Sequence, residues 1–316
     1  QSGKYPNFKS KIPDNHMTIK DLLSHQSGLT YGFSQKTEVD KAYREKGIGR
    51  MESLHTNQTL EDMINLLSEG PLEFNPGSSW NYSVSTDVLG YLIELISGKS
   101  FDTFLKERIF KPLNMNDSGF YVPESKLNRF AANYIFNEGK ESGESISLIN
   151  QDTKESGPPI LIEDPMISPY SKNPTFFSGG GGLVSTIDDY LNFCIMLLNK
   201  GSYKNHQILS EKTINLMTNN HITDKKDLLE TASGRWSETT YAGIGFGLGF
   251  QILLDPVKSQ IISSKGEYGW GGAASTVFWI DPKEDLITIF LTQLLPSSAY
   301  NIRRELRTLV YSSINN

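Results

Sequence analysis

The chain has 316 residues, 37% of them hydrophobic, and a formal net charge of −6, so it is long enough to bury a substantial core. Because no basic stripe or acidic tail accompanies that charge, neither nucleic acid nor an anionic membrane surface is an expected partner, whereas a small molecule or a peptide is. No apolar run reaches about eighteen residues, so no transmembrane helix is predicted. The five histidines are scattered without metal-binding spacing, so neither a metal site nor a cofactor is expected.

Helix signals occupy the first two thirds of the chain. Thr18 and Asp21 have the spacing of a capping box and predict a short helix that ends at Ser27-Gly28. Apolar stripes predict a helix that starts at Thr59 and another whose stripe runs from Val88 to Ile96 and is capped by Gly98. Further helices are predicted with N-caps at Ser100 and at Ser185 or Thr186. The single cysteine, Cys194, lies in the last of these runs and is expected to be buried. Residues 121–175 are rich in polar residues and proline and predict a long surface excursion.

The pattern changes to a period of two residues from position 243 onward. Three strands are predicted in GIGFGLGFQILLD, ASTVFWIDP and LITIFLTQL, with a tight turn at Asp281-Pro282-Lys283-Glu284. An amphipathic helix is predicted at the C-terminus. Helices in the middle and strands at the end favour an α+β fold in a single domain over 1–316. Helices and long loops are expected at approximately 29–200, and an antiparallel sheet with its C-terminal helix at approximately 240–316.

Two common catalytic motifs are absent from the sequence. No GxSxG occurs, which excludes the nucleophile elbow of the α/β-hydrolases, and no GxGxxG follows a strand. Five phrases remain: TIKDLLSHQSGL (18–29), NPGSSWNYSVSTDVLGYLIE (75–94), KPLNMNDSGF (111–120), SGGGGLVSTIDDYLNF (178–193) and YGWGGAASTVFWIDPKEDL (268–286). In order and spacing they resemble the serine β-lactamase-like hydrolases, which comprise class C β-lactamases, D-amino-acid peptidases and family VIII carboxylesterases. The resemblance covers nearly the whole chain. It implies a β-lactamase/transpeptidase-like fold, with an antiparallel sheet flanked by helices and a mainly helical lobe.

The resemblance also implies an acyl-transfer site built from three motifs. Tyr82 matches the tyrosine of Tyr-x-Asn, and Val84 stands where the family has asparagine, so an amide that would contact substrate is replaced. Trp270-Gly271-Gly272 matches the strand motif, which is Lys-Thr-Gly or His-Thr-Gly in many relatives and Trp-Gly-Gly in the esterases. The backbone N–H of Ala273 is then the implied donor to the oxyanion. Substrate is expected to contact positions 84, 270, 271 and 272.

The residue types favour an uncharged ester as substrate. A phenol with an ordinary pKa of about 10 is a poor base at neutral pH, so Tyr82 needs a nearby cation to act as one. An indole at position 270 offers an apolar wall and one N–H donor, where a lysine would attract a substrate carboxylate. The structural alternatives are that Tyr82 packs at a helix start and that WGGAA is a bulge with Trp270 in the core.

The first motif, Ser-x-x-Lys, does not occur anywhere in the sequence. In the family it precedes the phrase at 18–29, so the expectation is a chain that lacks the N-terminal segment and its outer strands. Without serine and lysine the chain is expected to be inactive as it stands. It is also expected to associate with itself or with a partner chain through an exposed sheet edge. The alternatives are a β-lactamase or D-amino-acid peptidase, and a binding protein that keeps the cleft without the chemistry.

Overall fold

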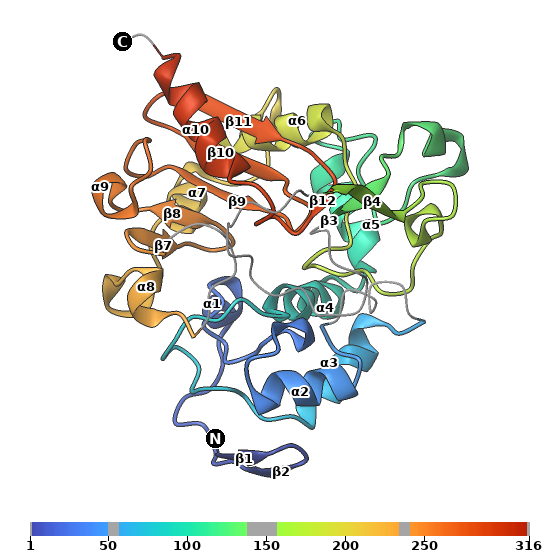
Figure 1. The fold of residues 1–316 in the computed structure, drawn as a ribbon, viewed down its shortest axis with the longest axis vertical. Helices are drawn as coiled ribbons and strands as arrows, with labels where there is room; N and C mark the ends of the chain where they lie inside the picture. The colour runs from blue at the N-terminus through green and yellow to red at the C-terminus, as the bar shows by residue number, and fades with distance from the viewer. Residues whose placement is uncertain (1, 50–56, 138–156, 234–240, 315–316) are drawn as a thin grey trace.

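The structure, a computed structural model, describes residues 2–49, 57–137, 157–233 and 241–314. Its largest sheet is antiparallel and has five strands in the order β11-β10-β9-β8-β7 (Figure 1). These strands are β7 (Ile244–Phe246), β8 (Gln251–Leu253), β9 (Tyr268–Gly271), β10 (Val277–Asp281) and β11 (Leu286–Phe290). The predicted α+β fold with an antiparallel sheet late in the chain is confirmed.

The single strand predicted over 243–255 is wrong, because this segment forms the hairpin of β7 and β8. Gly247 donates its N–H to the Phe250 carbonyl at 2.7 Å and closes the turn. Gly249 has φ of +99°, a backbone conformation that residues with a side chain rarely adopt. The alternation of glycine and apolar residues therefore continues through the turn between β7 and β8. Periodicity alone does not reveal that the chain reverses there. The turn at Asp281–Glu284 is confirmed, since Asp281 Oδ1 accepts the N–H of Lys283 at 3.0 Å.

Helices pack on both faces of this sheet. Helix α6 (Ile187–Leu198) contacts one face, where the ring of Tyr190 lies 5.1 Å from that of Phe278. Helix α10 (Ile302–Ser312) contacts the other face, where the Arg307 guanidinium lies 4.4 Å from the Trp279 ring. Successive residues of β10 thus point to opposite faces, as the strand period requires.

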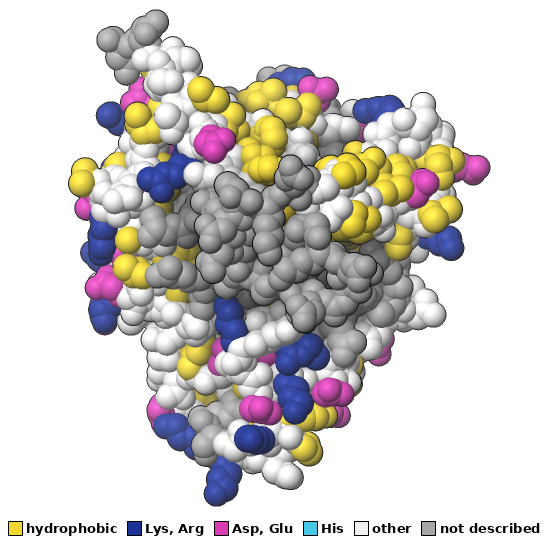
Figure 2. Space-filling view, viewed as in Figure 1, with side chains coloured by type: hydrophobic (Ala, Val, Ile, Leu, Met, Phe, Trp, Pro, Cys, Tyr) yellow, Lys and Arg dark blue, Asp and Glu magenta, His cyan; other side chains and the backbone are white. Residues whose placement is uncertain are grey.

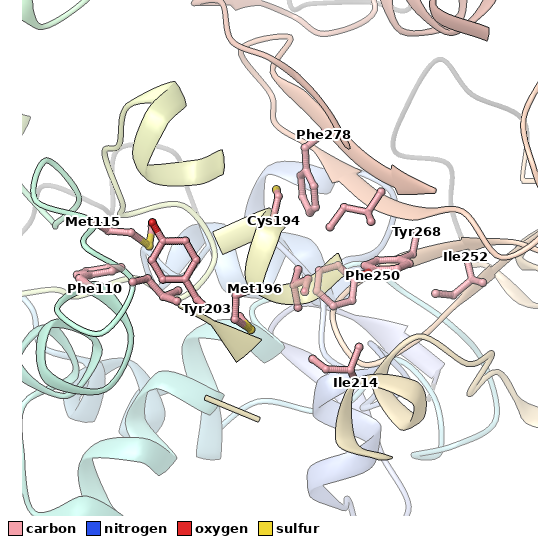
Figure 3. Packing of buried hydrophobic residues seen from close by; sticks show 13 residues of the cluster. Phe110, Met115, Cys194, Met196, Tyr203, Ile214, Phe250, Ile252, Tyr268 and Phe278 are labelled. Carbon is pink, nitrogen blue, oxygen red and sulfur yellow. The ribbon is translucent and has the colours of Figure 1, made fainter. Parts of the chain in front are cut away.

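The core between α6 and the sheet has an apolar centre. Cys194 is fully buried in it, as predicted. Figure 3 shows this cluster, in which side chains of α6 meet those of the sheet and of neighbouring loops. Its labelled members are Phe110, Met115, Cys194, Met196, Tyr203, Ile214, Phe250, Ile252, Tyr268 and Phe278. Burial of these side chains is the main source of stability for this half of the molecule.

The first part of the chain forms a lobe that consists mainly of helices. They are α1 (Ile19–Leu23), α2 (Glu38–Glu45), α3 (Leu60–Ser68), α4 (Ser85–Ser97) and α5 (Phe101–Leu105), which continues into a π-helical turn, η3 (Lys106–Phe110). Thr18 and Thr59 both form capping boxes, and Gly98 ends α4 with φ of +67°, so the predictions at these three positions are confirmed. The end predicted for the first helix at Ser27-Gly28 is wrong: α1 ends at Leu23, because His25 has a positive φ of +54° that breaks the helical backbone. A second apolar cluster, which includes Leu22, Tyr43, Met63 and Val84, lies inside this lobe.

Residues 121–175 contain more regular structure than the predicted excursion. Strands β3 (Asn133–Asn137) and β4 (Gly157–Glu163) pair with each other, and β12 (Leu294–Leu295) joins β3 in a small three-stranded sheet. The side chains of Ile160, Leu161 and Ile162 are about half exposed, and hydrophobic atoms gather over β4 in Figure 2. Residues 138–156 of the predicted excursion lie outside the described residues. In the described parts many side chains lie at the surface, and backbone pairing with β12, which the sequence pattern could not reveal, orders some of them.

Short elements complete the chain. They are β1 (Ser2–Lys4), β2 (Asn7–Lys9), β5 (Ser202–Tyr203), β6 (His206–Gln207), α7 (Glu211–Met217), α8 (Leu228–Thr231), α9 (Pro256–Ser259) and the 3-10 turns η1 (Gly32–Ser34), η4 (Glu124–Arg129), η5 (Pro169–Ser171) and η6 (Thr223–Lys225). Within the described ranges, no helix is long and apolar enough to cross a bilayer.

Strand β11 forms one edge of the large sheet. Among the described strands, only β10 pairs with it. An unpaired edge offers a row of N–H and C=O groups to another strand. The expected self-association through a sheet edge stays a prediction: light scattering after size-exclusion chromatography should show a mass above the 35.4 kDa of one chain. A monomer at all protein concentrations would contradict it.

Candidate active site

Tyr82 lies just before α4 and is held by hydrogen bonds to the loop that follows α1. Asn81 N–H donates to the His25 carbonyl at 2.9 Å, and Val84 N–H donates to the Thr30 carbonyl at 3.3 Å. The Asn81 side chain donates to the Leu29 carbonyl at 3.1 Å. The segment that carries Tyr82 is therefore fixed along its length to the phrase TIKDLLSHQSGL, which explains why the two phrases occur together.

The ring of Tyr82 sits in a cluster of aromatic side chains. Its centroid lies 4.8 Å from that of His25, 5.2 Å from Tyr31 and 5.3 Å from Trp270. Trp270 also meets Phe246 of β7 edge-on at 5.4 Å. The structure thus brings together Tyr82 and Trp270, two predicted site residues that are far apart in sequence, at the contact between the helical lobe and the sheet.

Two side chains hydrogen-bond to Tyr82, and both affect its acidity. Burial raises the pKa of Tyr82 above its ordinary value, whereas hydrogen bonds with Trp270 and Tyr31 act in the opposite direction. The negative charge of Asp87 raises the pKa further. The phenol is therefore protonated at neutral pH in this structure, and a positive charge would be needed to make it a base.

The predicted oxyanion donor lies in the turn between β9 and β10. Ala273 is exposed, and among the described residues its N–H has no hydrogen-bond acceptor, as a donor reserved for substrate requires. Gly272 closes the turn by donating its N–H to the Thr276 carbonyl at 2.9 Å. Trp270 and Ala273 thus lie three positions apart in sequence, at the end of β9 and in the turn that follows it.

Both glycines of the strand motif lie close to other side chains of the protein. A Cβ at Gly271 would lie 2.4 Å from Arg303 Cζ, and one at Gly272 would lie 2.3 Å from Thr276 Oγ1. The sequence interpretation attributed these glycines to the approach of a substrate. The structure adds another reason, because the protein's own side chains already occupy that space.

Val84 lies in the core of the helical lobe. Its side chain is fully buried, and a Cβ at Gly49 would come within 2.9 Å of its Cγ1. The valine that replaces the family's asparagine is thus packed among apolar neighbours. Its predicted contact with substrate stays a prediction.

Sequence reasoning assigned no role to Tyr31 and His25, which both contact Tyr82. Tyr31 lies two residues after the phrase that ends at Leu29, and its hydroxyl bonds to Tyr82. His25 lies within that phrase, with φ of +54° and its Nδ1 3.3 Å from Ser83 Oγ. The SHQSG phrase could have pointed to His25, whereas no pattern marks Tyr31.

The glycine tract at 178–182 surrounds a buried carboxylate. Ser178 Oγ donates to Asp87 Oδ1 at 2.5 Å, and Gly180 N–H donates to the same oxygen at 3.2 Å. A Cβ at Gly180 would lie 2.6 Å from the Tyr31 hydroxyl. Burial raises the pKa of Asp87, and these hydrogen bonds oppose the shift. The tract thus contacts Asp87 and Tyr31, which both interact with the Tyr82 hydroxyl.

In the described ranges, no three His, Cys, Asp or Glu side chains cluster as metal ligands.

His25 should make the stability of the protein depend on pH. Burial lowers its pKa from 6.5 to about 3. Below about pH 6.5 the unfolded chain binds a proton that the folded protein does not, so the stability present above that pH is lost progressively toward pH 3. When the pH is lowered from 7.5 to 5.5, the free energy of unfolding of wild type is expected to fall by about 1.4 kcal/mol more than that of His25→Gln. Urea denaturation at both pH values measures the difference. His206→Gln, at an exposed position, should behave as wild type, and equal losses in all three proteins would refute the assignment.

Comparison with known proteins agrees with this geometry. The profile of the family described as Beta-lactamase matches residues 5–312. The protein Rv1367c of Mycobacterium tuberculosis (strain ATCC 25618 / H37Rv) is 33% identical over 281 residues, which cover 88% of this chain and 62% of that protein. Esterase EstB of Burkholderia gladioli is 26% identical over 290 residues, covering 91% of this chain and 68% of EstB. The chain thus spans less than two thirds of the length of Rv1367c.

Solved structures show the same fold. EstCE1, described as a hydrolase with promiscuous acyltransferase activity, superposes with a TM-score of 0.72 at 26% identity, over 93% of this chain and 72% of EstCE1. A variant of simvastatin synthase (LovD) from Aspergillus terreus superposes with a TM-score of 0.70 at 23% identity, over 95% of this chain and 68% of its own. The β-lactamase/transpeptidase-like fold is therefore confirmed, and the chain belongs to the Beta-lactamase family of serine hydrolases, whose members include esterases, carboxypeptidases and acyltransferases.

Proposed function

We propose that this chain forms the tyrosine and oxyanion side of an acyl-transfer site that hydrolyses small, uncharged carboxylic esters. The contact between Trp270 and Tyr82, with ring centroids 5.3 Å apart, carries the proposal. At this position many relatives have a lysine or histidine that can attract a substrate anion. An indole adds no charge: its ring is tilted by 43° to that of Tyr82 and its side chain hydrogen-bonds to the phenol, so the position offers a neutral group, which favours an ester without a carboxylate.

Each proposed role follows from the position of one group. Tyr82 takes the proton from the nucleophile and returns it to the leaving alcohol. The Ala273 N–H stabilises the oxyanion that forms when the ester carbonyl is attacked. Substrate contacts extend over Trp270, Gly271 and Gly272. Water then hydrolyses the acyl-enzyme and releases the acid. The nucleophile and its lysine require a Ser-x-x-Lys sequence, which these 316 residues do not contain, so the proposal concerns the protein that supplies both groups.

Hydrolysis of p-nitrophenyl butyrate tests the proposal. The protein expressed from its complete coding sequence is expected to release p-nitrophenol and to be inactivated by a fluorophosphonate with a single covalent adduct. Residues 1–316 alone are expected to show no turnover above background, because Tyr82 has neither a nucleophile to deprotonate nor a cation to lower its pKa. Turnover by the purified 316-residue chain, verified by mass, would overturn the requirement for Ser-x-x-Lys.

Assays with other substrates distinguish the proposed esterase activity from the other activities of the family. Nitrocefin and a D-alanyl-D-alanine peptide each carry a carboxylate that an apolar wall at position 270 does not neutralise. The complete protein is expected to hydrolyse the butyrate ester faster than either one. A preference for nitrocefin or for the peptide would instead assign a β-lactamase or a D-amino-acid peptidase. A folded protein that binds these compounds without turnover would indicate a non-catalytic binding role.

A further inference from the structure

Helix α10 sends two arginines into the protein interior. Arg303 and Arg307 are four residues apart and therefore share one face of the helix, and they are only 7% and 2% exposed. Arg307 binds Glu267, just before β9, with Nη2 3.0 Å from Oε1. Arg303 reaches the other end of β9. The two side chains attach the helix to both ends of the strand that carries Trp270.

Arg303 holds both ends of the turn that presents Ala273. Its Nη2 donates to the Gly272 carbonyl at 2.7 Å and to the Thr276 carbonyl at 3.0 Å. The guanidinium lies against Gly271, where a Cβ would come within 2.5 Å of Nη2. The two N–H groups of Nη2 have fixed directions in the plane of a permanently charged guanidinium, whereas the ammonium of a lysine rotates at the end of a flexible stem and holds two carbonyls less rigidly.

A second attachment joins the same turn to β12. Ser275 has φ of +66°, and its Oγ donates to the Leu294 carbonyl at 2.6 Å. Leu294 N–H in turn donates to the Ala274 carbonyl at 3.1 Å. Four carbonyl or hydroxyl groups of the turn, on Gly272, Ala274, Ser275 and Thr276, are thus bound, and Ala273 lies between the first two in sequence. An oxyanion donor acts by being fixed in place before the reaction.

We propose that Arg303 is a positioning residue that sets the direction of the Ala273 N–H and thereby the stabilisation of the oxyanion. This inference rests on the proposed function, since it assigns Arg303 to the same acyl-transfer site. Arg303 does not touch substrate. It acts through the two carbonyls, so its loss should impair binding of the transition state more than binding of the ground state.

Kinetics of the complete protein test this role. Arg303→Lys is expected to lower kcat for p-nitrophenyl butyrate by about 10-fold or more, below the 10²- to 10³-fold cost of losing a donor outright, with KM changed less than about threefold. The affinity of an alkylboronic acid, which forms a tetrahedral adduct, should fall by the same factor as kcat/KM. Inhibition by butyrate, a ground-state product, should not change. Arg304→Lys, at a neighbouring and exposed arginine that binds the Gln260 carbonyl, is the matched control and should retain wild-type kinetics.

A second measurement does not depend on activity. Hydrogen exchange followed by mass spectrometry should show faster exchange of the Gly272 amide in Arg303→Lys, while peptides covering β8 stay unchanged. If Arg303→Lys does not fold, Ser275→Ala removes the second attachment, the hydrogen bond to the Leu294 carbonyl, and should give the same kinetic and exchange changes. A wild type without esterase activity would refute the proposed function alone. Normal kinetics and normal Gly272 exchange in Arg303→Lys would refute the positioning role.

Discussion

Tyr82→Phe is expected to lower kcat/KM for p-nitrophenyl butyrate by about 10²- to 10⁴-fold, the usual contribution of a general acid–base group. The substitution keeps the ring and its contacts with His25 and Trp270 but removes the one oxygen that can carry the proton. Because the hydroxyl takes part in hydrogen bonds with Trp270 and Tyr31, the free energy of unfolding should fall by only about 1 kcal/mol. Steady-state kinetics and urea denaturation on the complete protein measure the two effects separately.

A tyrosine outside the cluster provides the control for this experiment. Tyr121 is 40% exposed, and Tyr121→Phe should leave kcat/KM within about twofold of wild type. Activity of Tyr82→Phe within tenfold of wild type would contradict the assignment of Tyr82 as the proton-transfer group. A large loss of stability in that variant, with little loss of activity in the folded fraction, would favour the packing alternative.

Ala273→Pro is expected to reduce kcat by about 10²- to 10³-fold, because proline has no backbone N–H to offer the oxyanion. Ala273 is exposed in the turn before β10, and its φ is not positive, so the ring does not require a left-handed backbone. Among the described residues its N–H has no acceptor, so no hydrogen bond of the folded protein is lost. Stopped-flow measurement of the p-nitrophenol burst should show slower acylation with little change in KM.

Ala273→Ser is the matched variant, since it changes the side chain and keeps the N–H. It should retain a kcat close to that of wild type. If both substitutions are equally harmful, the side chain and not the N–H matters, and the oxyanion donor must be sought elsewhere. If Ala273→Pro is as active as wild type, the donor assignment is wrong.

Local signals in the sequence predicted the elements around the site well. Thr18 and Thr59 specify helix starts through side chains three residues apart, and Gly98 specifies a stop through its positive φ. Tyr82 and the Trp270 strand motif were found because they lie in phrases shared with a family. These features depend on neighbouring residues, so they can be read without knowing which segments meet.

The strand pattern was less reliable, and the reason is physical. Residues 243–255 alternate as one strand would, yet a positive φ at Gly249 reverses the chain between β7 and β8. Strand β3 pairs with β12, more than a hundred residues away. Alternation reports which face a residue occupies, but it does not report where the chain turns or which strand lies beside it.

The sequence by itself determined the family and the helix boundaries at Thr18, Thr59 and Gly98. It also proposed Tyr82, Trp270 and Ala273 as groups of the candidate site. Only the tertiary structure decided that Trp270 contacts Tyr82, that Tyr31 and Asp87 interact with the same phenol, and that Arg303 binds the turn of Ala273. These contacts join residues separated by tens to hundreds of positions. They arise because the packing of α4, α10 and the sheet places side chains with no local relationship within hydrogen-bonding distance.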